Sequence, residues 1–552
     1  MLTMKRTLVL AGAAVLAAVL AATATAACGS GEARSEFEQP DSGDPGSDGS
    51  RVGDTSPPLH DDFKDPVFAE GATPSAVQVF AAPDGAGDAA GGGGPCLYAP
   101  QIGTLFPGNW LRPRFQFVPG AAENLFEIKL VVPHQISPLV IYTTKSGYIL
   151  DKHLWEVLTQ TGYGTVHLTV RSATVDAGGQ RTAGPFKGTD GDFEVAPPAV
   201  RATGSVLYWT TSGGTVLKGF KVGDEAVQTV VTPGSVQTQC VACHTSTPDG
   251  LYAGMTASTN PNDGTPSSIS IRSVDGLLKE PPFLSASAKG LLARLQYAPT
   301  FSKAHWQDGD HTMLSMFTVA AKTEIAWTDL EAKSAAQDAG WGVLARTGDL
   351  GAASSAVFSH DGTKVGYVSA TASSAGVIAT DGRIHVIPYA NRKGGPATPV
   401  PGASDPAFNQ FYPTFSADDQ LLAFNRVSAT GNSTSYNNPA AEVYVVATSG
   451  GTPSRLVAND PPACLAKKSP GITNSWPKWS PEVQDAGGKS YYFLVFSSTR
   501  NPASNGPQLY VAPIVVQGGV VKTYAALDLW NQPENENNHT PAWDVFQLPG
   551  PK

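Results

Sequence analysis

The sequence predicts an all-β protein: an N-terminal β-sandwich followed by a β-propeller of roughly six blades. Two observations predict this fold class. From residue 204 onward a unit of strand, turn and strand recurs at intervals of roughly 55–65 residues. In residues 96–200, short runs alternate apolar and polar side chains between turn residues. The 58 glycines and 44 prolines also suit many short strands better than long helices.

Residues 1–28 have the features of an export signal. Two basic residues precede an apolar run from Leu8 to Leu20, and small residues then lead to Cys28. The run is too short to span a bilayer comfortably, which favours a cleaved signal. Small residues directly before a cysteine resemble a bacterial lipoprotein signal, although Thr25 stands where that pattern usually has an aliphatic residue. The resemblance implies that Cys28 is lipidated; the alternative is ordinary secretion with Cys28 removed.

Residues 29–95 are rich in Gly, Ser, Asp and Pro, so we expect a disordered tether. Many lipoproteins that stay at the inner membrane have an acidic residue directly after the lipidated cysteine, whereas this chain has Gly29 at that position. We therefore expect a bacterial cell-envelope protein anchored to the outer membrane, on its periplasmic or surface face, or a secreted protein without the lipid. The net charge of −10 and the lack of a basic patch argue against nucleic acid. The expected partners are the membrane, through the lipid, and an envelope protein.

Residues 96–200 contain the alternating runs Arg114–Val118, Leu125–Val131 and Thr165–Val170. About five to seven such strands over this length are typical of a β-sandwich. The segment resembles immunoglobulin- and fibronectin-like sandwiches, with Trp155 preceding the last of these runs. Both a binding role and a structural spacer role fit it.

Residues 204–548 carry the repeat. Each unit begins with a strand that ends in Ser, followed by a polar turn and two aliphatic strands. Four such first strands are Tyr297–Ser302, Ser355–Ser359, Phe411–Ser416 and Ser475–Ser480. One unit cannot bury both of its faces, so we expect the units to stack radially as blades. This pattern resembles the propeller of TolB-like proteins, which implies the same ring of blades.

The two ends of the repeat region complement each other. His539–Asp544 is a first strand with no blade after it, and Ser205–Thr210 is an outer strand with no first strand before it. We expect the chain ends to share one blade, because closure removes the exposed edges that an open sheet leaves.

The sequence Cys240-Val241-Ala242-Cys243-His244 has the spacing of a c-type haem-attachment motif. This five-residue resemblance to cytochromes c implies one haem, held by thioether bonds from Cys240 and Cys243, with His244 as the proximal axial ligand. Three alternatives are a Cys240–Cys243 disulfide, a zinc site and a thioredoxin-like motif. The zinc site has no fourth ligand nearby, and the thioredoxin-like motif lacks its βαβ context.

His244 aligns with the prolines of the first strands, which predicts a haem at one mouth of the central channel. His539 begins the first strand of the neighbouring blade, so it is the candidate distal axial ligand; the alternative is a strand cap in solvent. Aromatic side chains expected to ring the same mouth are Tyr297, Tyr412 and Trp476. Cys96 and Cys464 are a candidate disulfide between the two domains.

The chain contains none of the common hydrolase, phosphate-binding or dinucleotide-binding motifs, so we nominate no catalytic residue. The leading hypothesis is an exported, lipid-anchored propeller that uses one haem c for electron transfer or haem-based sensing. The alternative is a non-enzymatic envelope-binding scaffold whose Cys240 and Cys243 form a disulfide. A third hypothesis is a haem enzyme of the peroxidase type.

Overall fold

The computed structural model describes residues 58–85, 93–259, 268–294, 296–319, 322–374, 376–504 and 506–550. The expected export signal, its Cys28 and the first part of the expected tether lie outside these residues. Strands dominate the described chain, and the all-β fold is confirmed. The α-helices within it are short: α1 (Ala76–Phe80), α2 (Lys152–Gln160), α3 (Ala286–Leu292) and α4 (Lys303–Gln307). None of these helices has the length and apolar character that crossing a membrane requires.

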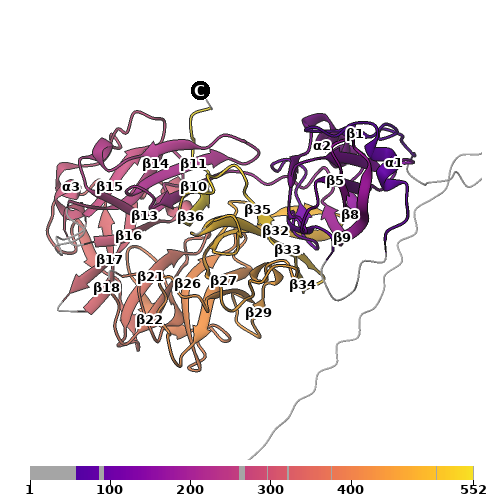
Figure 1. Cartoon of the computed structure of the whole chain (residues 1–552). Coiled ribbons are helices and arrows are strands. Elements are labelled where there is room, and N and C mark those ends of the chain that lie inside the picture. Colours follow the sequence, from indigo (N-terminus) through magenta and orange to yellow (C-terminus); the bar gives the residue numbers. More distant parts are fainter. Residues whose placement is uncertain are drawn as a thin grey trace, which may run out of the picture. The chain divides into compact units, whose positions relative to one another are not determined.

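Six antiparallel sheets follow one another around a ring in the described part of residues 205–544 (Figure 1). The β-propeller is therefore confirmed. The first three sheets, innermost strand first, are β36 (Asn538–Asp544), β10 (Ser205–Thr210), β11 (Val216–Lys221) and β12 (Gln228–Val231); β13 (Cys240–Ser246), β14 (Tyr252–Ser258) and β15 (Ser268–Ser273); and β16 (Gln296–Phe301), β17 (Thr312–Val319), β18 (Lys322–Asp329) and β19 (Trp341–Val343).

The other three sheets have the same order from the channel outward. They are β21 (Ala352–Phe358), β22 (Lys364–Ala370), β23 (Arg383–Pro388) and β25 (Thr398–Pro399); β26 (Phe408–Phe415), β27 (Leu421–Ser428), β28 (Glu442–Ala447) and β29 (Ser454–Arg455); and β30 (Asn474–Trp479), β32 (Lys489–Ser498), β33 (Gln508–Gln517) and β34 (Val520–Thr523), with β31 (Gln484–Ala486) on β32 and β35 (Leu527–Asp528) on β33. A short parallel pair, β20 (Arg346–Thr347) with β24 (Gly395–Pro396), joins two neighbouring sheets.

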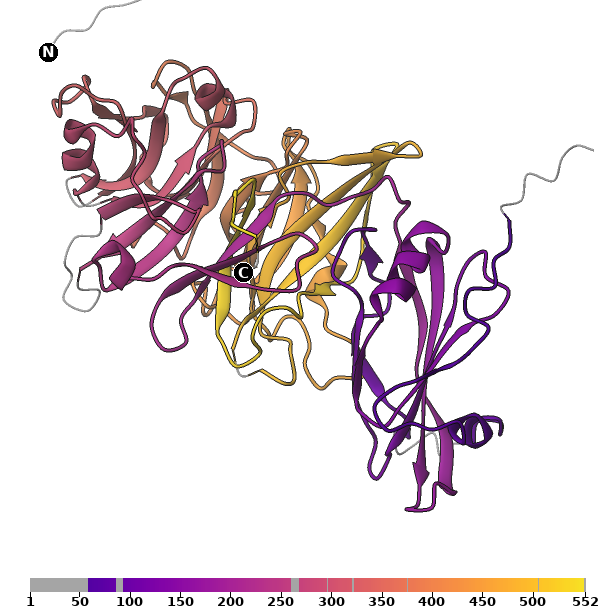
Figure 2. The ribbon, with the colours of Figure 1, turned by 90° about the horizontal axis from the view of Figure 1, so that it is seen from above.

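The ring is closed by a sheet that takes strands from both ends of the propeller. β36 pairs with β10, for example at Trp543 and Val206, and Figure 2 shows the yellow C-terminal strand beside the magenta strands. Each innermost strand contacts the innermost strand of the next sheet, and β13 contacts β36. The six innermost strands therefore form a closed ring around the channel.

The N-terminal part is built from two sheets. The six-stranded sheet contains, in order, β1 (Val67–Phe68), β6 (Leu139–Thr143), β5 (Leu125–Val131), β8 (Gly164–Val175), β9 (Arg181–Val195) and β3 (Leu105–Phe106). The three-stranded sheet contains β2 (Cys96–Ala99), β4 (Arg114–Val118) and β7 (Gly147–Ile149). Side chains from both sheets share one core, in which Phe115, Ile128 and Leu168 are fully buried. The immunoglobulin- or fibronectin-like class of this region stays a prediction.

The expected tether is too long at its C-terminal end. Residues 58–85 belong to the fold: β1 pairs with β6, and α1 buries Val79 and Phe80 against the six-stranded sheet. Phe63 is only 3% exposed. The sequence prediction failed here because a few apolar side chains spaced through a polar segment find their partners far along the chain.

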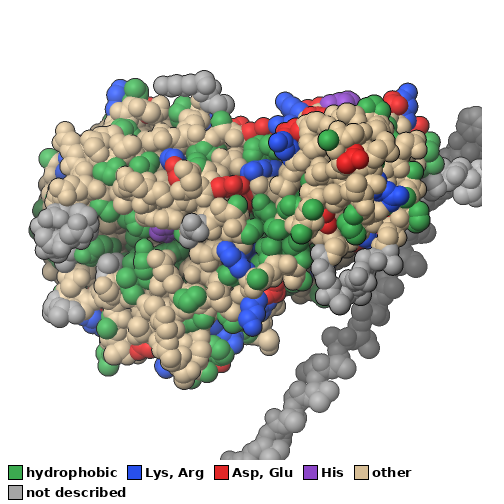
Figure 3. All heavy atoms as spheres, viewed as in Figure 1, with side chains coloured by type: hydrophobic (Ala, Val, Ile, Leu, Met, Phe, Trp, Pro, Cys, Tyr) green, Lys and Arg blue, Asp and Glu red, His purple; other side chains and the backbone are tan. Residues whose placement is uncertain are grey.

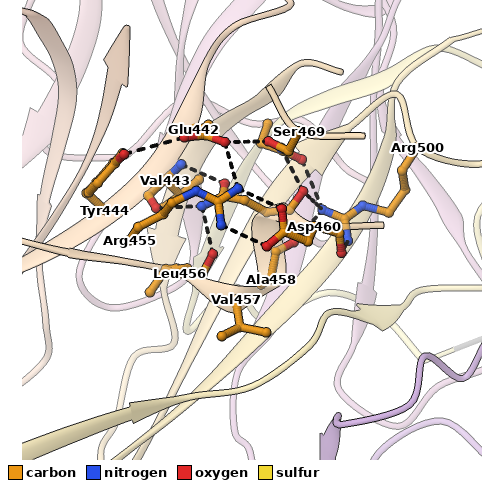
Figure 4. Close-up of polar contacts among 12 residues, drawn as sticks. Glu442, Val443, Tyr444, Arg455, Leu456, Val457, Ala458, Asp460, Ser469 and Arg500 are labelled. Carbon is orange, nitrogen blue, oxygen red and sulfur yellow. Dashed lines mark hydrogen bonds and ion pairs between the residues drawn. The ribbon is translucent and has the colours of Figure 1, made fainter. Parts of the chain in front are cut away.

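Cys96 and Cys464 are disulfide-bonded, with 5.7 Å between their Cα atoms and 368 residues between them in sequence. Beside this bond, the Gln101 amide donates a hydrogen bond of 2.9 Å to the Asp460 carbonyl oxygen. Figure 4 shows the polar cluster of this loop, in which Arg455 bridges Glu442 and Asp460, at 2.7 Å from each carboxylate. These contacts tie the Cys464 loop to its own sheet and to β2.

Candidate functional site

The six innermost strands share one local distortion. Each has a shift of pairing register next to a residue in the left-handed region, with φ from 33° at Cys243 to 61° at Trp476. The six left-handed residues are Cys243, Ala298, Ser355, Tyr412, Trp476 and Thr540. An extra, unpaired residue of this kind is a β-bulge, which re-aims the side chains that follow it.

Proline follows the left-handed residue in four of these strands, namely at Pro299, Pro413, Pro477 and Pro541. Proline is tolerated there because a bulge leaves the residue without a ladder hydrogen bond. His244 occupies the equivalent position on β13. His244 therefore places an imidazole where four of the other innermost strands have a proline side chain.

Two adjoining cavities run along the channel inside this ring, with volumes of ≈ 100 Å³ and ≈ 90 Å³. Both are lined by His244, Thr245, Thr300, Val357 and Lys478. We call the first the polar cavity, because it is also lined by Lys303, Ser359, His360, Ser480 and Asp544. We call the second the apolar cavity, because it is also lined by Cys243, Ala298, Tyr412, Pro413, Trp476 and Pro477.

Cys240 and Cys243 are free thiols in the structure, and both are partly buried. Cys243 lines the apolar cavity. Burial raises the pKa of the Cys243 thiol to about 11. The thiol is therefore protonated at neutral pH and is a poor nucleophile for thiolate chemistry.

The two ring nitrogens of His244 differ in their hydrogen bonding. It is 8% exposed, and its Nε2 lies 3.0 Å from the carbonyl oxygen of Leu207. Because a carbonyl oxygen only accepts, Nε2 carries the proton and donates it. Nδ1 is buried and has no hydrogen-bond partner among the described residues. Burial also lowers the pKa of His244 to about 4, so the ring is neutral at pH 7.

This arrangement fits the donor set that a covalent haem requires. Metal-ligating histidines characteristically donate their other N–H to a carbonyl or carboxylate, which fixes the tautomer and leaves a lone pair for the metal. His244 meets that requirement through Leu207, and two free thiols precede it on the same strand. The donor atoms on β13 are therefore of the kinds that a haem c site uses; Cys243 and His244 line the cavity of ≈ 90 Å³, and Cys240 lines neither cavity.

His539 is on β36, where it pairs with Trp209 of β10. Its ring packs against Trp209 with 4.6 Å between ring centroids, and its Nδ1 is 3.1 Å from the Thr540 hydroxyl oxygen. Burial, with a smaller contribution from His244, lowers its pKa to about 4. His539 does not line either channel cavity.

Two of the three expected rim aromatics lie on the apolar cavity. Tyr412 and Trp476 are stacked with 3.7 Å between centroids, and Tyr436 packs edge-on against Trp476. Tyr297 instead packs against the hydrophobic core between two blades. Sequence reasoning missed Tyr436, and it also missed Lys478, although Lys478 directly follows a proline that the repeat had brought to the channel.

Among the described residues, no group of three or more His, Cys, Asp and Glu side chains is placed to hold a metal ion. No protein-family model matches the chain, and no curated protein matches it.

Several solved structures resemble the chain at low similarity. A prolyl endopeptidase is 14% identical over 60% of this chain, with a TM-score of 0.30, and the chain spans about half (48%) of its length. A putative 6-phosphogluconolactonase from Bacteroides uniformis is 12% identical over 61% of this chain and 100% of its own, with a TM-score of 0.29. A quinoprotein alcohol dehydrogenase-like protein from Bacteroides thetaiotaomicron is 10% identical over 81% of this chain and 97% of its own, with a TM-score of 0.27. Likeness at this level says nothing about activity.

Proposed function

We propose that this protein carries one haem c on Cys240, Cys243 and His244 and acts in electron transfer or haem-based sensing. The observation that carries the proposal is the buried Nδ1 of a neutral His244, which has no hydrogen-bond partner in the part of the chain that the structure describes. Leu207 holds this ring, and two thiols precede it on β13. A covalently bound haem supplies a one-electron redox centre whose potential depends on its axial ligand and surroundings.

The chain's own residues have distinct tasks in this proposal. Cys240 and Cys243 each add a thiol S–H across a vinyl group, so that an S–C bond forms, the hydrogen passes to carbon and no oxidant is consumed. The stacked rings of Tyr412 and Trp476 form an apolar wall that excludes water.

The axial assignment in this proposal is His244 alone. His539 packs against Trp209 and lines neither cavity, so we do not assign it as the second ligand. We retain within the proposal lipid anchoring through Cys28 at the cell envelope, a TolB-like class of propeller and an immunoglobulin- or fibronectin-like N-terminal domain.

The proposal is tested by producing the full chain in a bacterial host with and without cytochrome c maturation machinery. The protein from the first host is expected to be red and to show sharp α and β absorption bands on reduction. The Cys240→Ser/Cys243→Ser variant is expected to be colourless, whereas Thr245→Ser, a change on the same strand, keeps the pigment. A colourless wild-type protein with Cys240 and Cys243 joined in a disulfide refutes the proposal and favours the envelope scaffold.

A further inference from the structure

A cleft with a volume of ≈ 580 Å³ lies outside the channel, between α2 and the loop that connects β11 to β12. Its walls come from α2, from segments 108–112 and 223–225, and from Arg201. We call it the α2 cleft. Its volume falls within the roughly 300–1000 Å³ of ligand sites, whereas the two channel cavities are much smaller. The α2 cleft is therefore large enough for a ligand of several rings, and the proposed function does not use it.

Hydrogen bonds hold the walls of the α2 cleft in place. Trp155 of α2 donates a hydrogen bond of 3.2 Å from its Nε1 to the Trp110 carbonyl oxygen, and both rings are buried. The Arg112 guanidinium donates hydrogen bonds of 2.5 and 2.8 Å to the two carboxylate oxygens of Glu225 on the facing wall. These contacts join groups of the protein to one another, so the cleft is formed before any ligand binds.

The polar side chains along the cleft are available to a ligand. Lys152, Glu156 and Gln160 are spaced four residues apart on α2, which puts them on one face of the helix, and all three line the cleft and are exposed. Arg201 and Asp224 line it as well. Among the described residues, none of these five side chains makes a hydrogen bond or an ion pair. The cleft therefore offers donors and acceptors that the fold itself does not use.

The charges of the α2 cleft balance. Its lining contains three basic and three acidic residues, namely Arg112, Lys152 and Arg201, and Glu156, Asp224 and Glu225. In the view of Figure 3, basic and acidic side chains are interspersed on the part of the surface where α2 lies. A lining of this kind attracts neither a polyanion nor a cation over a distance, which favours a ligand without net charge.

We propose that the α2 cleft binds a short, uncharged oligosaccharide. A hydroxyl group both donates and accepts hydrogen bonds, so a chain of sugar hydroxyls pairs equally well with basic donors and carboxylate acceptors. Hydrogen bonds with one ionised partner are also the stronger kind. A peptide with charged ends is the competing ligand. Its charges would meet exposed side chains, and ion pairs at exposed positions contribute little. This inference is independent of the proposed haem.

The experiment is isothermal titration calorimetry on full-length protein from the host with cytochrome c maturation machinery. Three neutral tetrasaccharides are the probes: maltotetraose, cellotetraose and N-acetylated chitotetraose. The tripeptide Gly-Gly-Gly is the zwitterionic probe. Wild-type protein is expected to bind at least one of the tetrasaccharides saturably and not to bind the tripeptide. The bound tetrasaccharide is also expected to raise the melting temperature, because it binds the folded chain only.

Glu156→Ala and Arg201→Ala remove one acceptor and one donor from opposite sides of the cleft. Each is expected to weaken binding of the tetrasaccharide by about tenfold, because a charge-assisted hydrogen bond is lost. Both residues are exposed, and urea unfolding of the two variants is expected to match the wild type. His153→Ala is the matched control: it changes an exposed residue of α2 that does not line the cleft, and it leaves binding unchanged.

Three results overturn the proposal. If none of the tetrasaccharides binds to wild-type protein, the site is not a sugar site. Tetrasaccharide binding that Glu156→Ala and Arg201→Ala leave at the wild-type level lies outside the α2 cleft. Saturable binding of Gly-Gly-Gly that both variants weaken, without binding of a tetrasaccharide, replaces the sugar by a peptide.

Discussion

His244 should make the stability of the colourless protein sensitive to acid, by an amount that follows from its burial. Its pKa in the fold is about 4, against an ordinary value of 6.5. Below pH 6.5 the unfolded chain binds a proton at this ring while the folded chain does not. The contribution of His244 to stability is therefore complete above pH 6.5 and is lost as the pH falls towards 4. Between pH 7 and pH 5 the loss amounts to about 2 kcal/mol.

The assay is urea unfolding of wild-type protein and His244→Gln at pH 7, 6 and 5. The variant is expected to lose about 2 kcal/mol less than the wild type over this range. The comparison with wild type matters because Asp528, whose pKa burial raises to about 7, contributes in the opposite direction as the pH falls. His153→Gln, a change at an exposed position, is the control. Parallel curves for wild type and His244→Gln would refute a buried, neutral His244.

Three further predictions concern the stability of the structure around the site. Removing the disulfide with Cys96→Ser/Cys464→Ser is expected to cost about 2–5 kcal/mol in urea unfolding, because the bond closes a very long loop; a loss below about 1 kcal/mol contradicts this. Ser355 has φ 51°, so Ser355→Val is expected to lower stability by about 1–3 kcal/mol while Ser355→Gly is tolerated; equal melting temperatures for both variants argue against the bulge. Trp476→Ala removes a buried ring stacked on Tyr412 and is expected to cost about 3–5 kcal/mol, and near-wild-type unfolding of this variant would show that the stack is not packed as described.

The propeller could be predicted from the sequence because each blade repeats a local hydrogen-bonded turn. The hydroxyls of Ser359 and Ser416, at the ends of innermost strands, donate hydrogen bonds to the carboxylates of Asp361 and Asp418, two residues later. Each bond is 2.6 Å long. Thr247 does the same with Asp249 after the Cys-Val-Ala-Cys-His motif. A Ser/Thr-x-Asp turn depends on neighbouring residues only, so its signal is visible in the sequence.

The wall of the channel was less predictable. The left-handed residue in each innermost strand shifts the alternation of faces, so periodicity does not reveal that both His244 and Thr245 line the channel. Lys478 was missed for this reason. The free Nδ1 of His244 depends on its hydrogen bond to Leu207, a residue 37 positions away on another blade, and no local pattern reports such a contact.

The most direct test of the central claim is whether pigment stays attached to the polypeptide after denaturation and acid–acetone extraction, measured by the intact mass of protein made with the maturation machinery. A covalent haem on Cys240 and Cys243 predicts a chain heavier by one haem, with the added mass located on the peptide that contains both cysteines. A mass equal to that of the unmodified chain, or lower by two hydrogens at those thiols, contradicts the claim.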